Sequence, residues 1–171
     1  MSGRGQAAGT RGPAPERTHA LDRWLYRGDR PNRLARLING AMARLAAAGI
    51  GPAQLVMLEV AGRRTGKTIS FPVVVADYQG ERYLVSMLGD KTNWVRNVHA
   101  ADGRAMLRRG HREVVQLEEV DPGQRAAILR RYLERSPGGR AHIPVGRGSP
   151  LQQYDRIAAQ YPVFRVTVPE G

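Results

Sequence analysis

The chain of 171 residues has no cysteine, few aromatic residues (6 %), and lysine only at positions 67 and 91. Without cysteine there is no disulfide framework, no thiolate nucleophile and no cysteine-ligated metal. No apolar run approaches the roughly 18 residues of a membrane helix, and the N-terminus lacks the hydrophobic segment of a signal peptide. We therefore expect a cytoplasmic protein without a transmembrane segment.

Positive charge is abundant: 27 Lys and Arg stand against 15 Asp and Glu, which gives a net charge of +12 and a pI of about 11.2. Such a charge suits nucleic acid, an anionic surface or anionic small molecules. The cations are spread along the chain and do not alternate with aromatic residues. We therefore favour a solvated basic surface, and a nucleic-acid-binding module is the least favoured of the functions that we consider.

The N-terminal residues 1–18 are rich in Gly, Ala, Pro and Arg, and they predict a disordered basic arm. Residues 19–171 are expected to form a single domain. Within that domain, apolar residues recur at helical spacing from Leu34 to Leu45 and predict an amphipathic helix.

Two β-rich stretches and the turn between them organise the rest of the chain. Leu55–Ala61 and Thr68–Ala76 are rich in Val, Ile and Phe, and the second alternates as a strand does. Residues 62–67 carry two glycines and three cations, a combination that suits a phosphate or a carboxylate. Pro72 cannot donate a ladder hydrogen bond, so its strand is expected to be a sheet edge or to be bulged there.

Further strands and helices follow in alternation. The expected strands are Arg82–Leu88, Ala105–Arg109, Glu113–Val120 and Val163–Val168. Capping signals predict helices that open at Asp90 or Thr92, at Asp121 and at Ser149. In the last of these, Leu151, Tyr154 and Ile157 are expected to face inward. Six strands joined mainly by hairpins predict an α+β domain with an antiparallel β-core and flanking helices.

Residues for self-sufficient catalysis are missing. The sequence Gly66-Lys67-Thr68 resembles the end of a phosphate-binding P-loop, but Ala61 stands where the first glycine is needed and a strand follows. The four histidines have no metal-ligand spacing, and Ser86 is expected inside a strand, away from any nucleophile elbow. We expect no metal site and no catalytic side chain, so difficult chemistry would come from a cofactor.

The turn and a later Trp-x-x-Asn segment together carry a family resemblance. Gly62-Arg63-Arg64-Thr65-Gly66-Lys67, a strand with Pro72-Val73, and Asn93-Trp94-Val95-Arg96-Asn97 follow in the order typical of the deazaflavin-dependent nitroreductase family. The resemblance implies a split β-barrel of about six strands, as in flavin-mononucleotide-binding oxidases. It also implies the deazaflavin coenzyme F420, with FMN as the alternative.

The same resemblance implies a set of cofactor-binding residues. They are Arg63, Arg64, Thr65, Gly66, Lys67, Phe71, Pro72, Val73, Val74, Met87, Trp94 and Asn97. The turn cations would hold the phosphate and acidic tail of the coenzyme, and the strand at 71–74 would lie along its ring. Met87 stands about where relatives carry a serine near the reactive ring. Trp94 is equally compatible with core packing, and Asn97 with a solvated position.

Two departures from the family pattern concern the substrate. The connection from Ser86 to Trp94 is shorter than in the classical members, and the family's aromatic cluster is reduced to Tyr132. Tyr132 is predicted either to line a substrate pocket or to pack in the core with the apolar residues on the same side of its helix. Reduction of nitro compounds therefore does not follow from the resemblance.

The sequence hypothesis is hydride transfer from reduced deazaflavin to a small electron-poor molecule such as a quinone, an enone or a nitro compound. A non-catalytic binder of a flavin-like cofactor is the alternative. Relatives with the split barrel suggest a homodimer.

Overall fold

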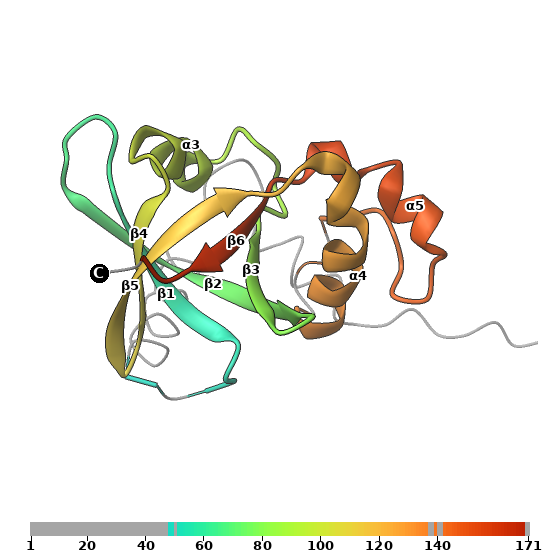
Figure 1. Ribbon diagram of the computed structural model, residues 1–171, viewed down its shortest axis with the longest axis horizontal. Coiled ribbons are helices and arrows are strands. Elements are labelled where there is room, and N and C mark those ends of the chain that lie inside the picture. Colours follow the sequence, from blue (N-terminus) through green and yellow to red (C-terminus); the bar gives the residue numbers. More distant parts are fainter. Residues whose placement is uncertain (1–47, 50, 137–138, 140–141, 170–171) are drawn as a thin grey trace, which may run out of the picture. The chain divides into compact units, whose positions relative to one another are not determined.

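The computed structural model describes residues 48–49, 51–136, 139 and 142–169 (Figure 1). The predicted arm 1–18 and the predicted helix Leu34–Leu45 lie outside the described residues. The strands are β1 (Leu55–Ala61), β2 (Thr68–Tyr78), β3 (Glu81–Val85), β4 (Arg104–Arg109), β5 (His111–Glu119) and β6 (Val163–Thr167). The helices are α3 (Asn93–Ala100), α4 (Arg125–Arg135) and α5 (Leu151–Asp155), with 3-10 turns η1 (Pro122–Gln124) and η3 (Ala158–Gln160).

The six strands close into an antiparallel barrel in the order β1-β2-β3-β6-β5-β4. Four of the strand pairings join strands that follow each other in the chain. Strand β6, near the end of the described chain, lies between β3 and β5. The prediction of an α+β fold with six antiparallel strands is confirmed, and so is the split β-barrel with flanking helices.

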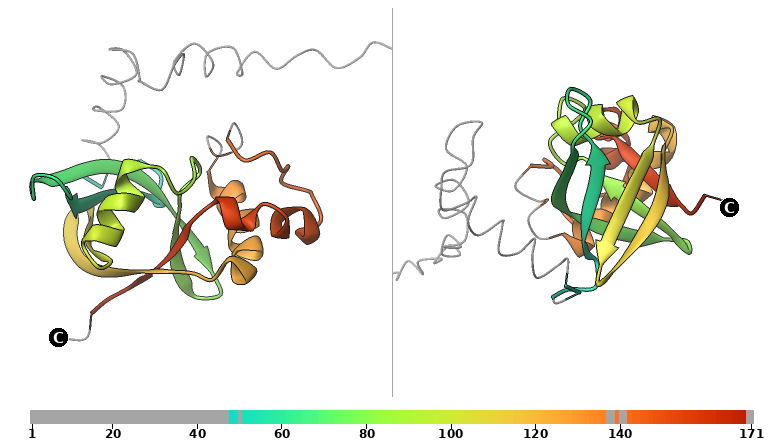
Figure 2. Two further views of the ribbon diagram at one scale, coloured as in Figure 1. Left: turned by 90° about the horizontal axis from the view of Figure 1, so that it is seen from above. Right: turned by 90° about the vertical axis from the view of Figure 1, so that its left-hand side faces the viewer.

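Side chains that point into the barrel form one apolar core, and α3 closes one end of it. Val95 and Val98 of this helix are buried against Phe164 and Leu117 of the barrel interior. The left view in Figure 2 looks from above and shows α3 lying across the strands. Leucine, valine and phenylalanine burial of this kind supplies the main stabilisation of a small barrel.

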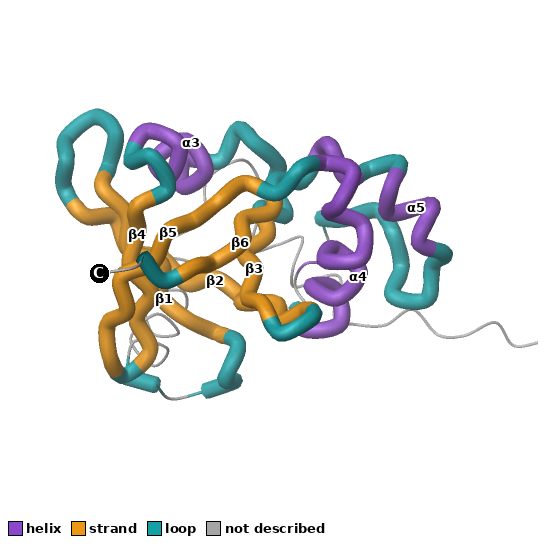
Figure 3. Tube along the Cα trace, viewed as in Figure 1, coloured by secondary structure: helices purple, strands orange, loops and turns teal. Residues whose placement is uncertain are grey.

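A second apolar core forms between the outer face of β2 and β3 and the helices α4 and α5, which lie on one side of the barrel (Figure 3). Asp121 begins this helical segment, because its Oδ1 accepts a hydrogen bond from the amide of Gly123 at 2.8 Å. The predicted cap is therefore confirmed, with a 3-10 turn before α4.

Two strands end elsewhere than predicted. β2 is two residues longer, because the two-residue turn at Gln79 and Gly80, both with positive φ, delays its reversal. β3 ends at Val85, because the hydroxyl of Ser86 donates to the carbonyl of Gly89 at 2.6 Å and bends the chain out of the sheet. The expectation that Ser86 lies inside a strand is therefore wrong.

The last helix is also smaller than predicted. α5 begins after Pro150 without a side-chain cap from Ser149, and it is only five residues long. Tyr154 is fully buried as expected, whereas Leu151 is 39 % exposed, so its predicted inward orientation is wrong. The described residues contain no helix that is long and apolar enough to span a membrane.

Candidate functional site

The turn between β1 and β2 is closed by its own glycines. The amides of Thr65 and Gly66 donate to the carbonyl of Gly62 at 3.2 and 2.8 Å, and Gly62 donates back to the carbonyl of Lys67 at 2.9 Å. Gly66 has φ +66°, a conformation that glycine adopts without strain. These amides are therefore engaged within the turn, and an anion here would be held mainly by side chains.

One of the three turn cations is fixed to α3. Asn97 is 1 % exposed, and its Oδ1 accepts from the amide of Arg63 at 3.3 Å and from Arg63 Nη1 at 3.0 Å. Arg63 Nη2 also donates to Asn93 Oδ1 at 3.3 Å. Both views of Figure 2 show the tip of the β1–β2 hairpin beside α3. Asn97 thus holds the turn in place, and it is not the solvated residue that we considered as an alternative.

The other two turn cations have no such partner. Among the described residues, the side chains of Arg64 and Lys67 make no hydrogen bond and no ion pair, and both are exposed. They stand on a turn whose orientation Arg63 fixes. The arrangement can bind an anionic group by charge and by several N–H donors.

Trp94 joins the helix to the strand that follows the turn. Its ring centroid lies 6.1 Å from that of Phe71 on β2 and 5.4 Å from that of Phe164 on β6. The indole is half-buried, and it packs against the barrel core. Trp94 therefore has the packing role that the sequence allowed, and it retains an exposed part beside β2.

The first half of β2 is a sheet edge. Thr68 to Val74 pair with β1, but the pairing of β2 with β3 begins only at Val75. Phe71, Pro72, Val73 and Val74 are half-buried, so this edge is neither covered nor fully solvated. The prediction that Pro72 lies on an edge is confirmed, and the backbone beside it can face a planar ligand.

Met87 and Tyr132 meet at the other flank of β2. The Tyr132 hydroxyl lies 3.7 Å from the Met87 sulfur, and both pack with Val74 in the outer apolar core. Tyr132 is 3 % exposed, and burial raises the pKa of its phenol. The phenol is neutral at physiological pH and lies within the apolar core, which favours the packing alternative.

The structure thus gathers the predicted residues along one strand. The turn, Trp94 and Asn97 lie where β2 begins, and Met87 with Tyr132 lie farther along its outer face. Two features escaped the sequence reasoning. Asn93 also accepts from Arg63, and the Ser86, Gly89 and Thr92 oxygens form a bonded turn before α3.

Two hollows in the described part of the molecule have volumes of about 520 and 560 Å³, and neither is lined by a predicted cofactor residue. The smaller lies between β3, β5 and α4. The larger lies at the barrel end opposite α3. The candidate site is therefore an open edge and a turn, not one of these two hollows.

Residues 34–142 match the model of a family described as F420H(2)-dependent quinone reductase. This match covers more than half of the chain and includes the turn, the β2 edge and α3. No protein with a curated description matches the chain significantly.

Several solved structures resemble the chain. An F420-H2-dependent reductase, FDR-A, has 18 % identity over 67 % of this chain and 94 % of its own, with a TM-score of 0.45. A domain-swapped dimer has 17 % identity over 78 % and 99 %, with a TM-score of 0.49. The protein Atu2129 of Agrobacterium tumefaciens, of unknown function, has 13 % identity over 79 % and 55 %, with a TM-score of 0.52. Because the identity to Atu2129 is only 13 %, that likeness supports the fold of this chain and nothing about its function.

Proposed function

Because the chain belongs to the F420H(2)-dependent quinone reductase family, we propose that it binds reduced F420 along the β2 edge and reduces a quinone. The family makes the chain an F420-dependent oxidoreductase. The choice of residues and of substrate is our proposal.

The turn suits the anionic tail of the coenzyme. Arg64 and Lys67 are exposed cations without a partner among the described residues, and Asn97 fixes the turn that carries them. A phosphate and a chain of carboxylates need several such donors, because each exposed contact contributes little by itself. Arg63 contributes its charge while its N–H groups hold the helix, so it acts mainly as a positioning residue.

The β2 edge suits a flat ring. Its backbone from Phe71 to Val74 has no strand partner on the β3 side, and Pro72 removes one donor from the strand. Trp94 borders the start of this edge and Met87 lies near its end. When bound, the deazaflavin supplies a hydride to the substrate. The chain's own residues position the ring and shield it from water.

A quinone is favoured over a charged substrate. Ile69 on β2 is 43 % exposed and Phe71 to Val74 are half-buried, so the edge itself is largely apolar. No carboxylate that would attract a cationic substrate is among the predicted site residues. Hydride transfer gives the quinone both electrons and one hydrogen, and the single proton that completes the hydroquinone can come from solvent. The reaction therefore needs no acidic or basic side chain at this site. Enones and nitro compounds are the competing substrates.

Turnover with the full-length protein tests this proposal. Reduced F420 is mixed with menadione, 2-cyclohexenone or a nitroimidazole, and the return of the visible absorbance of oxidised F420 is followed. We expect the fastest turnover with menadione. Binding of F420 without turnover of any of the three would instead support a non-catalytic binder, and absence of binding would refute the proposed cofactor.

We also propose that the protein is a homodimer. Sedimentation velocity at micromolar concentration distinguishes a particle of 18.8 kDa from one of twice that mass. A dimer that dissociates when F420 is removed would place part of the site at the subunit boundary.

A further inference from the structure

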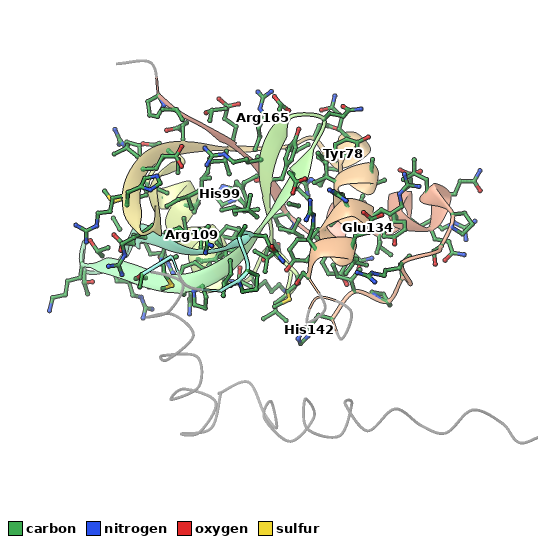
Figure 4. All side chains as sticks on the ribbon, turned by 90° about the horizontal axis from the view of Figure 1, so that it is seen from below. Tyr78, His99, Arg109, Glu134, His142 and Arg165 are labelled. Atoms are coloured by element: carbon green, nitrogen blue, oxygen red, sulfur yellow. The ribbon has the colours of Figure 1, made fainter. Side chains whose placement is uncertain are left out.

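The barrel end opposite α3 contains the hollow of about 560 Å³. We call it the barrel mouth. It is lined where β1, β3 and β5 begin and where β2 and β4 end. Its apolar floor consists of Val56, Val75 and Leu107, which belong to the interior core. Figure 4 views the molecule from the side of this end and labels Arg109 there. The volume lies within the range of small-molecule sites.

Both carboxylates of the barrel mouth already have cationic partners. Glu113 accepts two hydrogen bonds from Arg82, at 2.8 and 2.7 Å. Asp77 Oδ2 accepts from Arg131 at 3.0 Å and from Arg135 at 2.9 Å. These hydrogen bonds lower the pKa of both carboxyls. The two carboxylates therefore remain charged and are neutralised within the protein.

Two arginines with hydrogen-bond donors, Arg109 and Arg135, also line the barrel mouth. Arg135 Nε is buried and has no hydrogen-bond partner, one of two such side-chain atoms in the described part of the chain. Arg109 also lines the mouth, and it donates to the carbonyls of Gly51 at 3.1 Å and Leu55 at 3.4 Å. Nε of Arg135 is itself shielded from solvent, but the Arg135 side chain as a whole is 39 % exposed. Among the described residues, Nη2 is its only nitrogen that makes a hydrogen bond, so Nη1 is left to donate to a ligand oxygen. The mouth therefore offers donors and positive charge above an apolar floor.

We propose that the barrel mouth binds a small carboxylate with a compact apolar body. Its carboxylate would pair with Arg135 and its apolar part would lie against Val56, Val75 and Leu107. None of these residues belongs to the candidate coenzyme site, which lies at the other end of the barrel. The proposal therefore stands or fails independently of the proposed function.

Sodium benzoate is the probe that we choose. Full-length protein with labelled methyl groups is titrated at low ionic strength, and the resonances of Val56, Val75 and Leu107 are followed. We expect saturable shifts, and affinity at least about tenfold lower for benzyl alcohol, which lacks the charge. No saturable shift with benzoate, or equal binding of the alcohol, would overturn the proposal.

A matched pair of variants locates the charge. Arg135→Gln removes the unpartnered donor, whereas Arg130→Gln removes an equal charge from an exposed position of the same helix. Benzoate affinity should fall about tenfold in R135Q and change less than about twofold in R130Q. Equal affinities in the two variants would contradict the assignment. The amide spectrum of each variant verifies that it is folded.

A third variant tests the location without removing a charge. Ala53 is exposed at the rim of the barrel mouth, and Ala53→Trp would obstruct entry. Benzoate binding should be lost in A53W while F420 binding is retained. Retained benzoate binding in A53W would place the ligand elsewhere and refute the proposal.

Discussion

At the scale of the residue, Asn97 decides how the cationic turn is held. Its amide oxygen receives two hydrogen bonds from Arg63, although the two residues are 34 positions apart in sequence. In the sequence, Trp94, Val95, Val98 and Ala101 recur at helical spacing and share one face of this segment, which leaves Asn97 out. Periodicity identified the apolar face but could not show which polar neighbour a distant turn would bury.

Asn97→Ala should cost about 1–2 kcal/mol of unfolding free energy, because the amide and the guanidinium of Arg63 lose their common acceptor, the buried side chain of Asn97. F420 affinity should fall as well, since the turn loses its fixed orientation. Asn93→Ala is the matched control, because Asn93 is exposed and makes one contact of 3.3 Å. Chemical denaturation and F420 titration provide the two measurements. Equal effects of the two variants would show that Asn97 has no special role.

Arg64→Gln and Lys67→Gln should each weaken F420 binding roughly fivefold, the usual worth of one exposed charged contact. Their stability should be unchanged, because neither side chain has a partner among the described residues. Calorimetric titration measures the affinity, and R130Q is the control for net charge. If F420 affinity fell equally in R130Q, the effect would come from the net charge of the protein and not from contacts of Arg64 and Lys67 with the coenzyme.

At the scale of the element, the sequence predicted the strands well and their ends poorly. The alternation that includes Val73 and Val75 was sufficient for β2. The expected strands Ala105–Arg109 and Glu113–Val120 form the β4–β5 hairpin, which turns at Gly110 with φ +74°. The end of β3 depends on the hydroxyl of Ser86, which donates a hydrogen bond to the carbonyl of Gly89. The spacing of apolar residues in the sequence does not predict such a bond. Strand ends therefore need tertiary information.

Trp94→Ala should destabilise the closure of the barrel by α3, by about 2–4 kcal/mol, because the indole packs between Phe71 and Phe164. Trp94→Phe should retain most of that stability. Thermal unfolding followed by circular dichroism gives the comparison. If both variants unfold at the same temperature as the wild type, the indole contributes nothing to the stability that comes from packing α3.

The Arg82–Glu113 ion pair, which joins β3 to β5 across the barrel mouth, predicts a pH dependence. The bidentate hydrogen bonds from Arg82 lower the pKa of Glu113 below its unfolded value of 4.5. Since the folded pKa is the lower one, the pair stabilises the protein fully above the unfolded pKa, and this stability is lost as pH falls through the folded pKa.

Glu113→Gln should therefore lower stability at neutral pH and flatten its decline between about pH 5 and the folded pKa. Urea unfolding at a series of pH values measures both quantities. Wild type and E113Q that decline in parallel below pH 5 would show that Glu113 is not linked to the acid transition.

At the scale of the whole molecule, nearly half of the positive side chains in the described residues are paired with carboxylates. Eight arginines of the described residues form ion pairs with carboxylates, namely Arg82, Arg104, Arg108, Arg112, Arg125, Arg131, Arg135 and Arg165. A net charge of +12 by itself could not distinguish these from Arg64 and Lys67. The barrel mouth was likewise invisible in sequence, because barrel closure brings together the ends of five strands.

The central claim is that F420 lies along the turn and the free edge of β2. The most direct test is a map of backbone amide shifts in full-length protein titrated with F420. The account predicts the largest shifts at residues 63–67, 71–74 and 93–97, and small shifts at the barrel mouth around Arg109 and Arg135. Saturable shifts that gather at the barrel mouth and leave the β2 edge unchanged would contradict it.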